Sequence, residues 1–215
     1  IINAHSWDFN DTLNIKKNNI KKNNYFLYLD QYAHGHPDYS YFKLNKIDPK
    51  SFYDSLNSFF YQLEKKFKKK IIIAAHPKAN KNSYIYKRKS YFKGRDIYFD
   101  STMSLTQNCF ATLSHDTTAI SYSVIYKKPI IFIVNNEMIR IKTNRENEIA
   151  IFAKELGSYL INIDNNNCLK NVGAHLNKIN KKKYNNYFID YIKNKKNNKN
   201  KRIDKIICEL HTRNS

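Results

Sequence analysis

Three clusters of polar residues, each directly after an apolar run, have side chains that suit the binding of a phosphate group. They are Asp30-Gln31, His76-Pro77-Lys78 and Ser114-His115-Asp116-Thr117-Thr118. Hydroxyl, imidazole and ammonium groups can donate hydrogen bonds to an anion. The sequence has only 4 glycines and contains neither GxGxxG nor a P-loop GxxxxGKS or GxxxxGKT, which excludes both glycine-rich phosphate motifs. A phosphate site in this chain would therefore use helix ends, hydroxyls, His and Lys.

The third cluster lies between a predicted strand at 110–113 and a predicted helix at 119–126, which a second β-branched run follows at 130–134. This order places the cluster at the amino end of a helix, where unpaired N–H groups and the helix dipole favour an anion. The same residue types also suit simple helix capping. The expected N-cap is Asp116, Thr117 or Thr118, and the expected last turn contains Lys127 and Lys128.

Apolar runs and amphipathic stretches alternate along most of the chain, which predicts an α/β fold: a Rossmann-like, doubly wound and mostly parallel sheet. The expected strands cover 25–31, 71–75, 96–100, 110–113, 130–134 and 158–163. The expected helices cover 49–69, 101–108, 119–126, 144–156 with Gly157 as C-cap, one or two between 169 and 192, and 203–210. A variable loop is expected after Val134. In such sheets ligands bind beyond the carboxyl ends of the strands, where the three polar clusters would converge.

The predicted domain organisation has one sizeable domain at 25–192, preceded by an irregular leading arm at 1–24 with Trp7 and Phe9 as anchors. Residues 193–215 are expected to form a basic linker and a C-terminal helix. The chain begins without an initiator Met, a basic n-region or a cleavage signal, so we expect a fragment of a longer chain.

The formal net charge is +20, nearly all of it from lysine, and hydrophobic residues make up 41% of the chain. That composition supports a folded core, and the charge favours anionic partners such as nucleotide phosphates, acidic lipid head groups or nucleic acid. No run approaches the length of a membrane span. Cys109, Cys168 and Cys208 are odd in number and widely spaced, which indicates a reducing compartment and a cytoplasmic location.

A family resemblance rests on a strand that ends in His76-Pro77, followed some 35 residues later by a strand, a Ser/Thr-rich turn, a helix and Lys128-Pro129-Ile130-Ile131. Over about residues 25–164 this order resembles the C-terminal, donor-binding half of GT-B glycosyltransferases of bacterial surface-polysaccharide assembly. It is similar in particular to bacterial sialyltransferases, Kdo transferases and polyol-phosphate transferases. The resemblance implies a GT-B C-terminal-domain fold, whose acceptor domain lies elsewhere.

The same resemblance implies which residues bind the donor. In the family, the His of the His-Pro motif and the hydroxyls of the Ser/Thr turn contact the phosphate and sugar of the nucleotide, which correspond here to His76, Pro77, Ser114, Thr117 and Thr118. Because His115-Asp116 interrupts the usual hydroxyl pair, either Ser114 or the Thr117-Thr118 pair takes the phosphate. Lys78, His115, Asp116 and Gln31 complete the expected donor site.

The implied reaction is displacement at an anomeric carbon with the nucleotide as leaving group. His76 is the expected catalytic residue, since a protonated imidazole can hydrogen-bond the departing phosphate. The donor would be a CMP-, UDP- or GDP-linked sugar and the acceptor a glycan or a lipid-linked glycan of a capsule or lipopolysaccharide. The scheme requires no metal or other cofactor. The basic region 181–202 would contact the anionic inner face of the cell membrane.

Two other functional classes remain open. His34, His36 and Asp38 stand at alternate positions as in the HxHxDH signature of metal-dependent hydrolases, although Tyr39 replaces the last His; His76, His115 and Asp116 would be further ligands. A nucleic-acid binding module would instead use the net charge, the basic tail and the aromatic residues among basic ones. Those aromatic residues are Tyr84, Tyr86, Tyr91 and Phe92.

Overall fold

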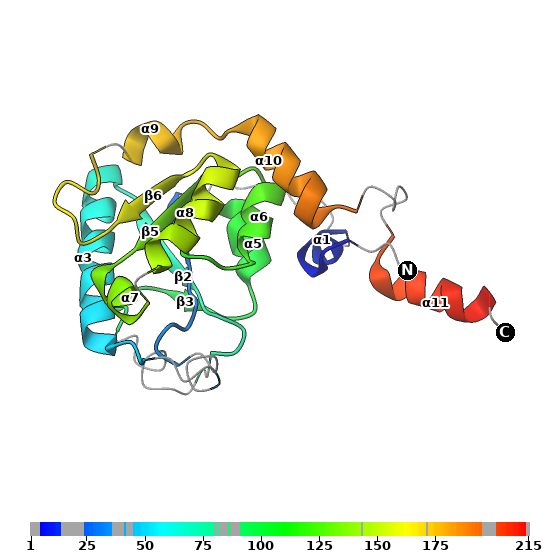
Figure 1. The fold of residues 1–215 in the computed structure, drawn as a ribbon, viewed down its shortest axis with the longest axis horizontal. Helices are drawn as coiled ribbons and strands as arrows, with labels where there is room; N and C mark the ends of the chain where they lie inside the picture. Colours follow the sequence, from blue (N-terminus) through cyan, green and yellow to red (C-terminus); the bar gives the residue numbers. More distant parts are fainter. Residues whose placement is uncertain are drawn as a thin grey trace.

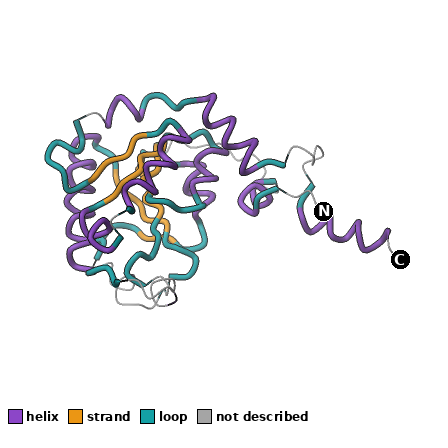
Figure 2. Tube along the Cα trace, viewed as in Figure 1, coloured by secondary structure: helices purple, strands orange, loops and turns teal. Residues whose placement is uncertain are grey.

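The computed structural model of the chain describes residues 5–13, 24–35, 41, 45–79, 81, 86, 91–142, 144–170, 172–194 and 201–213. Its centre is a sheet of six strands, all parallel to their neighbours, with helices on both faces (Figures 1 and 2). The strands are β1 (Tyr25–Leu29), β2 (Lys70–Ala74), β3 (Ile97–Tyr98), β4 (Ala111–Ser114), β5 (Ile130–Val134) and β6 (Tyr159–Asn162). This is an α/β Rossmann-like fold, and the predicted fold class is confirmed.

The strand order β3-β2-β1-β4-β5-β6 determines where a ligand can bind. The chain runs outward from β1 to β3 and then returns to place β4 on the other side of β1. The strand order therefore reverses between β1 and β4, and a crevice at the carboxyl ends of such a pair is the usual ligand site of open parallel sheets. The buried β-branched residues of β2 and β5 explain why these short strands lie in the interior of the sheet.

The described helices precede β1, connect successive strands and follow β6. They are α1 (Trp7–Thr12), α3 (Pro49–Phe67), α5 (Thr102–Asn108), α6 (Ile120–Ile125), α7 (Asn136–Ile141), α8 (Arg145–Leu156), α9 (Val172–Leu176), α10 (Lys181–Tyr187), the π-helix η1 (Phe188–Ile192) and α11 (Ile203–Arg213). α3 packs on one face of the sheet, where its Phe60 ring contacts Tyr28 of β1. α6 packs on the other, where its Ser123 hydroxyl lies 3.0 Å from that of Thr112 of β4. None of the described helices combines the length and the apolar composition that crossing a bilayer requires.

α3 forms where its sequence predicts a helix. Asp48 caps it by accepting a hydrogen bond from the Ser51 N–H at 2.8 Å, and Pro49 occupies the first turn. Its apolar face is buried against the sheet. It ends at Phe67, two residues before the predicted end, because Lys68 adopts the left-handed conformation at φ +53°.

The segment after β5 corrects a prediction. A variable loop was expected after Val134, but Asn136–Ile141 forms α7. Asn135 caps this helix by accepting a hydrogen bond from the Met138 N–H at 3.0 Å. Glu137 joins it to the start of α3, since its carboxylate accepts the Asp48 N–H at 2.6 Å. The helix therefore depends on a contact with a segment far away in sequence.

The amino-terminal segment also differs from its prediction. Residues 7–12 form α1 rather than an irregular arm, and Phe9 is buried against Phe188 of η1 at a ring distance of 5.5 Å. Trp7, expected to be an anchor, is 71% exposed. The proposed domain boundary at 24/25 stays a prediction.

Replacing Gly157 by alanine is expected to cost about 2 kcal/mol of unfolding free energy. Gly157 ends α8 at φ +60°, which disfavours any side chain by about 1 kcal/mol, and an added Cβ would lie 2.9 Å from Asn180 Cβ and from Lys183 Cδ. Gly94→Ala is the matched control, because Gly94 has φ +80° but nothing within 4 Å of the added Cβ. In urea unfolding, Gly94→Ala should lose about half as much unfolding free energy as Gly157→Ala. Equal losses would mean that the close contacts with Asn180 and Lys183 add no cost.

Candidate functional site

A hydrogen bond joins the segments that follow β1 and β4 at the carboxyl edge of the sheet. Gln31, two residues after β1, donates from Nε2 to Asp116 Oδ1 at 3.0 Å, and Asp116 lies two residues after β4. Two of the three predicted polar clusters are therefore in direct contact at the point where the strand order reverses. This contact defines the candidate site.

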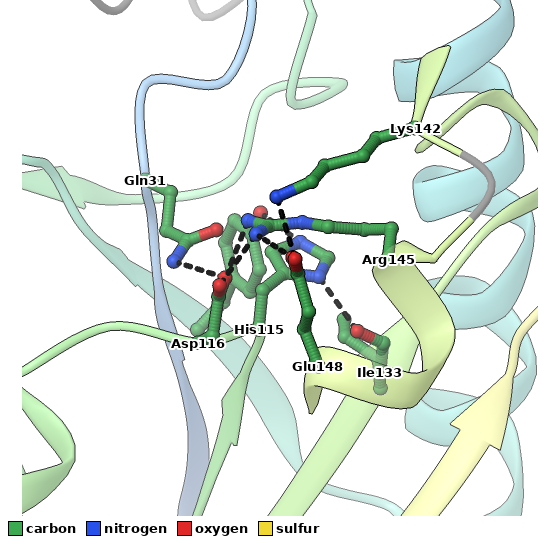
Figure 3. A network of polar contacts seen from close by, with 8 residues as sticks. Gln31, His115, Asp116, Ile133, Lys142, Arg145 and Glu148 are labelled. Atoms are coloured by element: carbon green, nitrogen blue, oxygen red, sulfur yellow. Dashed lines mark hydrogen bonds and ion pairs between the residues drawn. The ribbon is translucent and has the colours of Figure 1, made fainter. Parts of the chain in front are cut away.

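Arg145 binds the Asp116 carboxylate through both terminal nitrogens. Nη1 donates to Oδ2 and Nη2 to Oδ1, each at 2.5 Å, in the bidentate geometry that fits a guanidinium to a carboxylate (Figure 3). Arg145 also contacts Glu148 Oε2 at 3.4 Å, and Glu148 Oε1 lies 2.6 Å from Lys142 Nζ. The network thus alternates two cations with two carboxylates, and its charges nearly cancel.

His115 is fully buried and links β1 and β5 through its two ring nitrogens. Nδ1 lies 2.7 Å from the Ile133 carbonyl of β5, and Nε2 lies 3.0 Å from the Tyr28 hydroxyl of β1. A carbonyl only accepts, so Nδ1 carries the proton and Nε2 accepts from Tyr28. Burial lowers the pKa of His115 to about 4, which keeps the ring neutral at pH 7. With both nitrogens engaged, His115 could contact a donor only by breaking one of these bonds.

Ser114 and the two threonines of the third cluster lie in different environments. The Ser114 hydroxyl is buried and has no hydrogen-bond partner within the described part of the chain. The hydroxyl of Thr117 accepts the Ala119 N–H at 3.3 Å, whereas Thr118 is exposed. An unpaired buried hydroxyl is costly, so Ser114 is the hydroxyl that gains most from a bound partner.

The helix after the third cluster is shorter than predicted. α6 begins at Ile120 with Ala119 as N-cap and no capping side chain, so the expectation that Asp116, Thr117 or Thr118 caps it is wrong. Asp116 is instead bound to Arg145. Lys127 and Lys128 lie beyond the last turn, where Lys127 has φ +53° and the Lys128 N–H donates to the Ser123 carbonyl at 2.8 Å.

The His-Pro cluster follows β2 at the same edge of the sheet. His76 is partly buried and its Nδ1 accepts the Lys78 N–H at 3.1 Å, which places the ring proton of the neutral form on Nε2. Pro77 and Lys78 are exposed. Because β1 separates β2 from β4, His76 and Asp116 extend from strands about 10 Å apart. All three predicted clusters therefore lie at one edge, but not around a single point.

Asp30 closes the end of β1 and is buried. Its carboxylate accepts the Tyr86 hydroxyl at 2.5 Å and the Tyr32 N–H at 3.1 Å. Burial raises the pKa of Asp30 to about 6, and the hydrogen bonds oppose the shift. Tyr86 and Phe92 belong to the aromatic stretch that a nucleic-acid module would use, yet both are buried in the core, so neither offers a face to a base. Tyr84 lies outside the described residues.

Of the three residues in the predicted metal-binding motif, the structure describes only His34. His34 Nδ1 lies 2.8 Å from the buried Tyr53 hydroxyl, and burial lowers the pKa of His34 to about 4. His36 and Asp38 lie outside the described residues. Within the described ranges, no three His, Cys, Asp or Glu side chains are grouped to hold a metal ion. The metal-dependent alternative stays a prediction.

Sequence reasoning missed Arg145, Lys142 and Glu148. A signal was present, since the predicted helix at 144–156 has an arginine in its first turn, where the helix dipole disfavours a cation. Such an arginine needs a carboxylate partner, and Asp116 is that partner. The predicted parallel order placed both residues at the carboxyl edge.

No protein-family model matches this chain, and no curated protein sequence matches it. Among solved structures, two of the UDP-GlcNAc 2-epimerase from Methanocaldococcus jannaschii are similar, one of them in complex with UDP-GlcNAc and UDP. They align with TM-scores of 0.46 and 0.45 at 17% and 16% sequence identity, over 78% and 79% of this chain. Each match spans less than half of the epimerase chain, at 44% and 42%. Similarity at this level establishes neither a family nor an activity.

Proposed function

We propose that this chain is the donor-binding part of a glycosyltransferase that uses a nucleotide-activated sugar. The observation that carries the proposal is the position of three polar clusters at the carboxyl ends of β2, β1 and β4, on both sides of the point where the strand order reverses. The clusters after β2 and β4 extend from strands about 10 Å apart, which suits an extended ligand with several polar groups better than a single phosphate. The His-Pro and Ser/Thr motifs supply the likeness to surface-polysaccharide glycosyltransferases.

In this proposal a phosphate of the donor binds at His76, with Lys78 adding positive charge, and the hydroxyls of Ser114, Thr117 and Thr118 contact other phosphate or sugar oxygens of the same extended ligand. The hydrogen bond between Gln31 and Asp116 fixes the segments after β1 and β4 beside the donor. Charge develops on the departing phosphate during displacement, so donors that are already oriented lower the barrier. His76 would donate from Nε2, because its Nδ1 accepts the Lys78 N–H.

The proposed acceptor is a glycan or a lipid-linked glycan, and the proposed setting is the cytoplasmic side of the cell membrane. The acceptor site would lie in a second domain, as the GT-B resemblance implies. The base that deprotonates the acceptor would come from that domain, since His115 and Asp30 are buried and already hydrogen-bonded.

A thermal-shift and calorimetric screen with CMP, CDP, UDP and GDP, with and without EDTA, tests the donor assignment. One nucleotide is expected to raise the melting temperature with the logarithm of its concentration, because it binds only the folded chain, and EDTA should not change this. His76→Ala is expected to lower the affinity for that nucleotide about 10- to 100-fold, the cost of one charge-assisted hydrogen bond.

His211→Ala is the matched control, because His211 lies on α11 and is exposed. It should leave nucleotide affinity unchanged. If no nucleotide stabilises the wild-type chain, or if His76→Ala binds as tightly as the wild type, the donor assignment is wrong. Stabilisation that EDTA abolishes would favour the metal-dependent alternative.

A further inference from the structure

One end of the molecule presents large aromatic side chains to solvent. Trp7 of α1 is 71% exposed and Tyr191 of η1 is 64% exposed, and the Tyr191 ring contacts that of Tyr187 at 4.8 Å. An exposed tryptophan loses the stabilisation that burial of its large apolar surface would provide. These exposed rings, carried by neighbouring helices, are called the patch below, and exposed apolar surface of this kind suits a partner.

The two helices that carry this patch are joined firmly. The Ser6 N–H donates to the Ile192 carbonyl at 2.9 Å, and the Asn194 N–H donates to His5 Nδ1 at 3.1 Å. The Phe9 ring packs against Phe188 beneath them. Trp7 is the residue after Ser6, and Tyr191 is the residue before Ile192, so both are next to the hydrogen bond that joins the two segments. The exposed aromatic residues therefore lie on helices that are fixed to each other by hydrogen bonds and by the packing of Phe9 on Phe188.

The sequence on both sides of η1 is basic. Between positions 181 and 205 the sequence has two acidic residues, Asp190 and Asp204, against nine lysines and one arginine. The described basic residues of this region are Lys181, Lys182, Lys183, Lys193, Lys201, Arg202 and Lys205. Lys201 pairs with Glu209 and Arg202 with Asp204, whereas Lys181 and Lys182 are exposed at the start of α10. Aromatic residues beside lysines match the composition of proteins at a bilayer interface.

α11 adds an amphipathic element at the same end of the molecule. It projects from the body near α1 and η1, at the end opposite α3 (Figure 1). Ile203, Ile206 and Ile207 follow the helical spacing of one face, and Ile207 is 43% exposed. Isoleucine side chains gain little from the phosphates of a nucleic acid but gain burial in acyl chains.

We propose that the end formed by α1, η1 and α11, called the aromatic end below, binds an anionic lipid bilayer. Trp7 and Tyr191 lie at the level of the head groups, the isoleucine face of α11 lies in the interface, and the lysines of α10 approach the acidic lipids. Aromatic residues at the interface and basic residues near acidic head groups are the two contributions that make peripheral binding stable when combined. This inference does not depend on the identity of the donor.

The single tryptophan of the chain gives a direct test. We expect the emission of Trp7 in the full chain to shift to shorter wavelength on addition of vesicles containing phosphatidylglycerol, and to be quenched by brominated acyl chains. Vesicles of phosphatidylcholine alone should give a much weaker change. Binding without any shift in emission would overturn the role of the aromatic residues. A shift that follows protein concentration without vesicles would show that a second copy covers the patch, and would also overturn the proposal.

Matched variants separate the aromatic end from the general positive charge. Lys181→Gln combined with Lys182→Gln should weaken partition into anionic vesicles about fivefold per lysine. Tyr191→Ser should weaken it further and reduce the emission shift. Lys50→Gln with Lys65→Gln removes the same charge from α3 at the far end. Equal weakening by this control would overturn the assignment of the surface.

Discussion

Replacing His115 by phenylalanine is expected to lower the free energy of unfolding by about 3 kcal/mol and the melting temperature by about 10 °C. Phenylalanine retains most of the ring volume, so the loss comes from hydrogen bonds. The Tyr28 hydroxyl and the Ile133 carbonyl would each lose a partner in the interior, and a buried group left unpaired costs about 1–3 kcal/mol. Urea unfolding and calorimetry measure both quantities.

A double-mutant cycle with Tyr28→Phe tests whether the lost stability comes from the hydrogen bond between His115 and Tyr28. The double variant no longer contains the unpaired tyrosine hydroxyl, so its loss should be smaller than the sum of the two single losses by about 0.5–3 kcal/mol. Additive losses would mean that the hydrogen bond between His115 and Tyr28 contributes nothing to stability.

The same variant should change the pH dependence of stability. Burial lowers the pKa of His115 to about 4 from an ordinary value of 6.5, so between these values the unfolded chain binds more protons. The wild type therefore loses stability from this group as the pH falls from about 6.5 to about 4, by about 3 kcal/mol in total. His34 acts in the same direction, whereas Asp30, with its pKa raised to about 6, stabilises the fold more as the pH falls. The difference between wild type and His115→Phe isolates the His115 contribution, and a difference independent of pH would contradict it.

The sheet could be predicted from the sequence because each central strand is a short apolar run. β5 occupies the predicted residues Ile130–Val134, since all five are buried and β-branched or aromatic, a pattern that no alternating surface strand shows. β3 was predicted at 96–100 but pairs only at Ile97–Tyr98, because an edge strand has one neighbour to define its length. Long-range contacts could not be predicted: α7 depends on the hydrogen bond between Glu137 and Asp48, which are distant in sequence.

In the candidate site, too, the positions of the polar clusters could be predicted from the sequence, whereas their long-range contacts could not. That three polar clusters share one edge followed from the parallel order, and the structure confirms that they follow β1, β2 and β4. The separate environments within the third cluster could not be predicted, because they depend on contacts with β1, α3 and α8. His115 lies on the face of Tyr28 and Phe52, whereas Ser114 alternates to the other face and Asp116 points to Arg145. Sequence grouped these neighbours as one phosphate site, but alternation along a strand sends adjacent side chains apart.

Replacing Arg145 by methionine is expected to weaken nucleotide binding at least tenfold and to cost about 2 kcal/mol of stability. Both terminal nitrogens of Arg145 neutralise Asp116, and both side chains are mostly buried. Without Arg145 a negative charge would stand uncompensated at the edge where the phosphate is proposed to bind, and like charges repel strongly away from water. Calorimetry with the stabilising nucleotide and urea unfolding measure the two effects.

Asp116→Asn in the same chain distinguishes two roles of Arg145. If its role is to neutralise Asp116, the double variant lacks the uncompensated carboxylate and should recover most of the affinity, while Gln31 keeps a hydrogen-bond partner. If Arg145 itself contacts the phosphate, the double variant should bind as weakly as Arg145→Met alone. We expect recovery, because the guanidinium is already bound by two carboxylates, Asp116 and Glu148. Lys142→Met is the control, since Lys142 contacts Glu148 and should change affinity little.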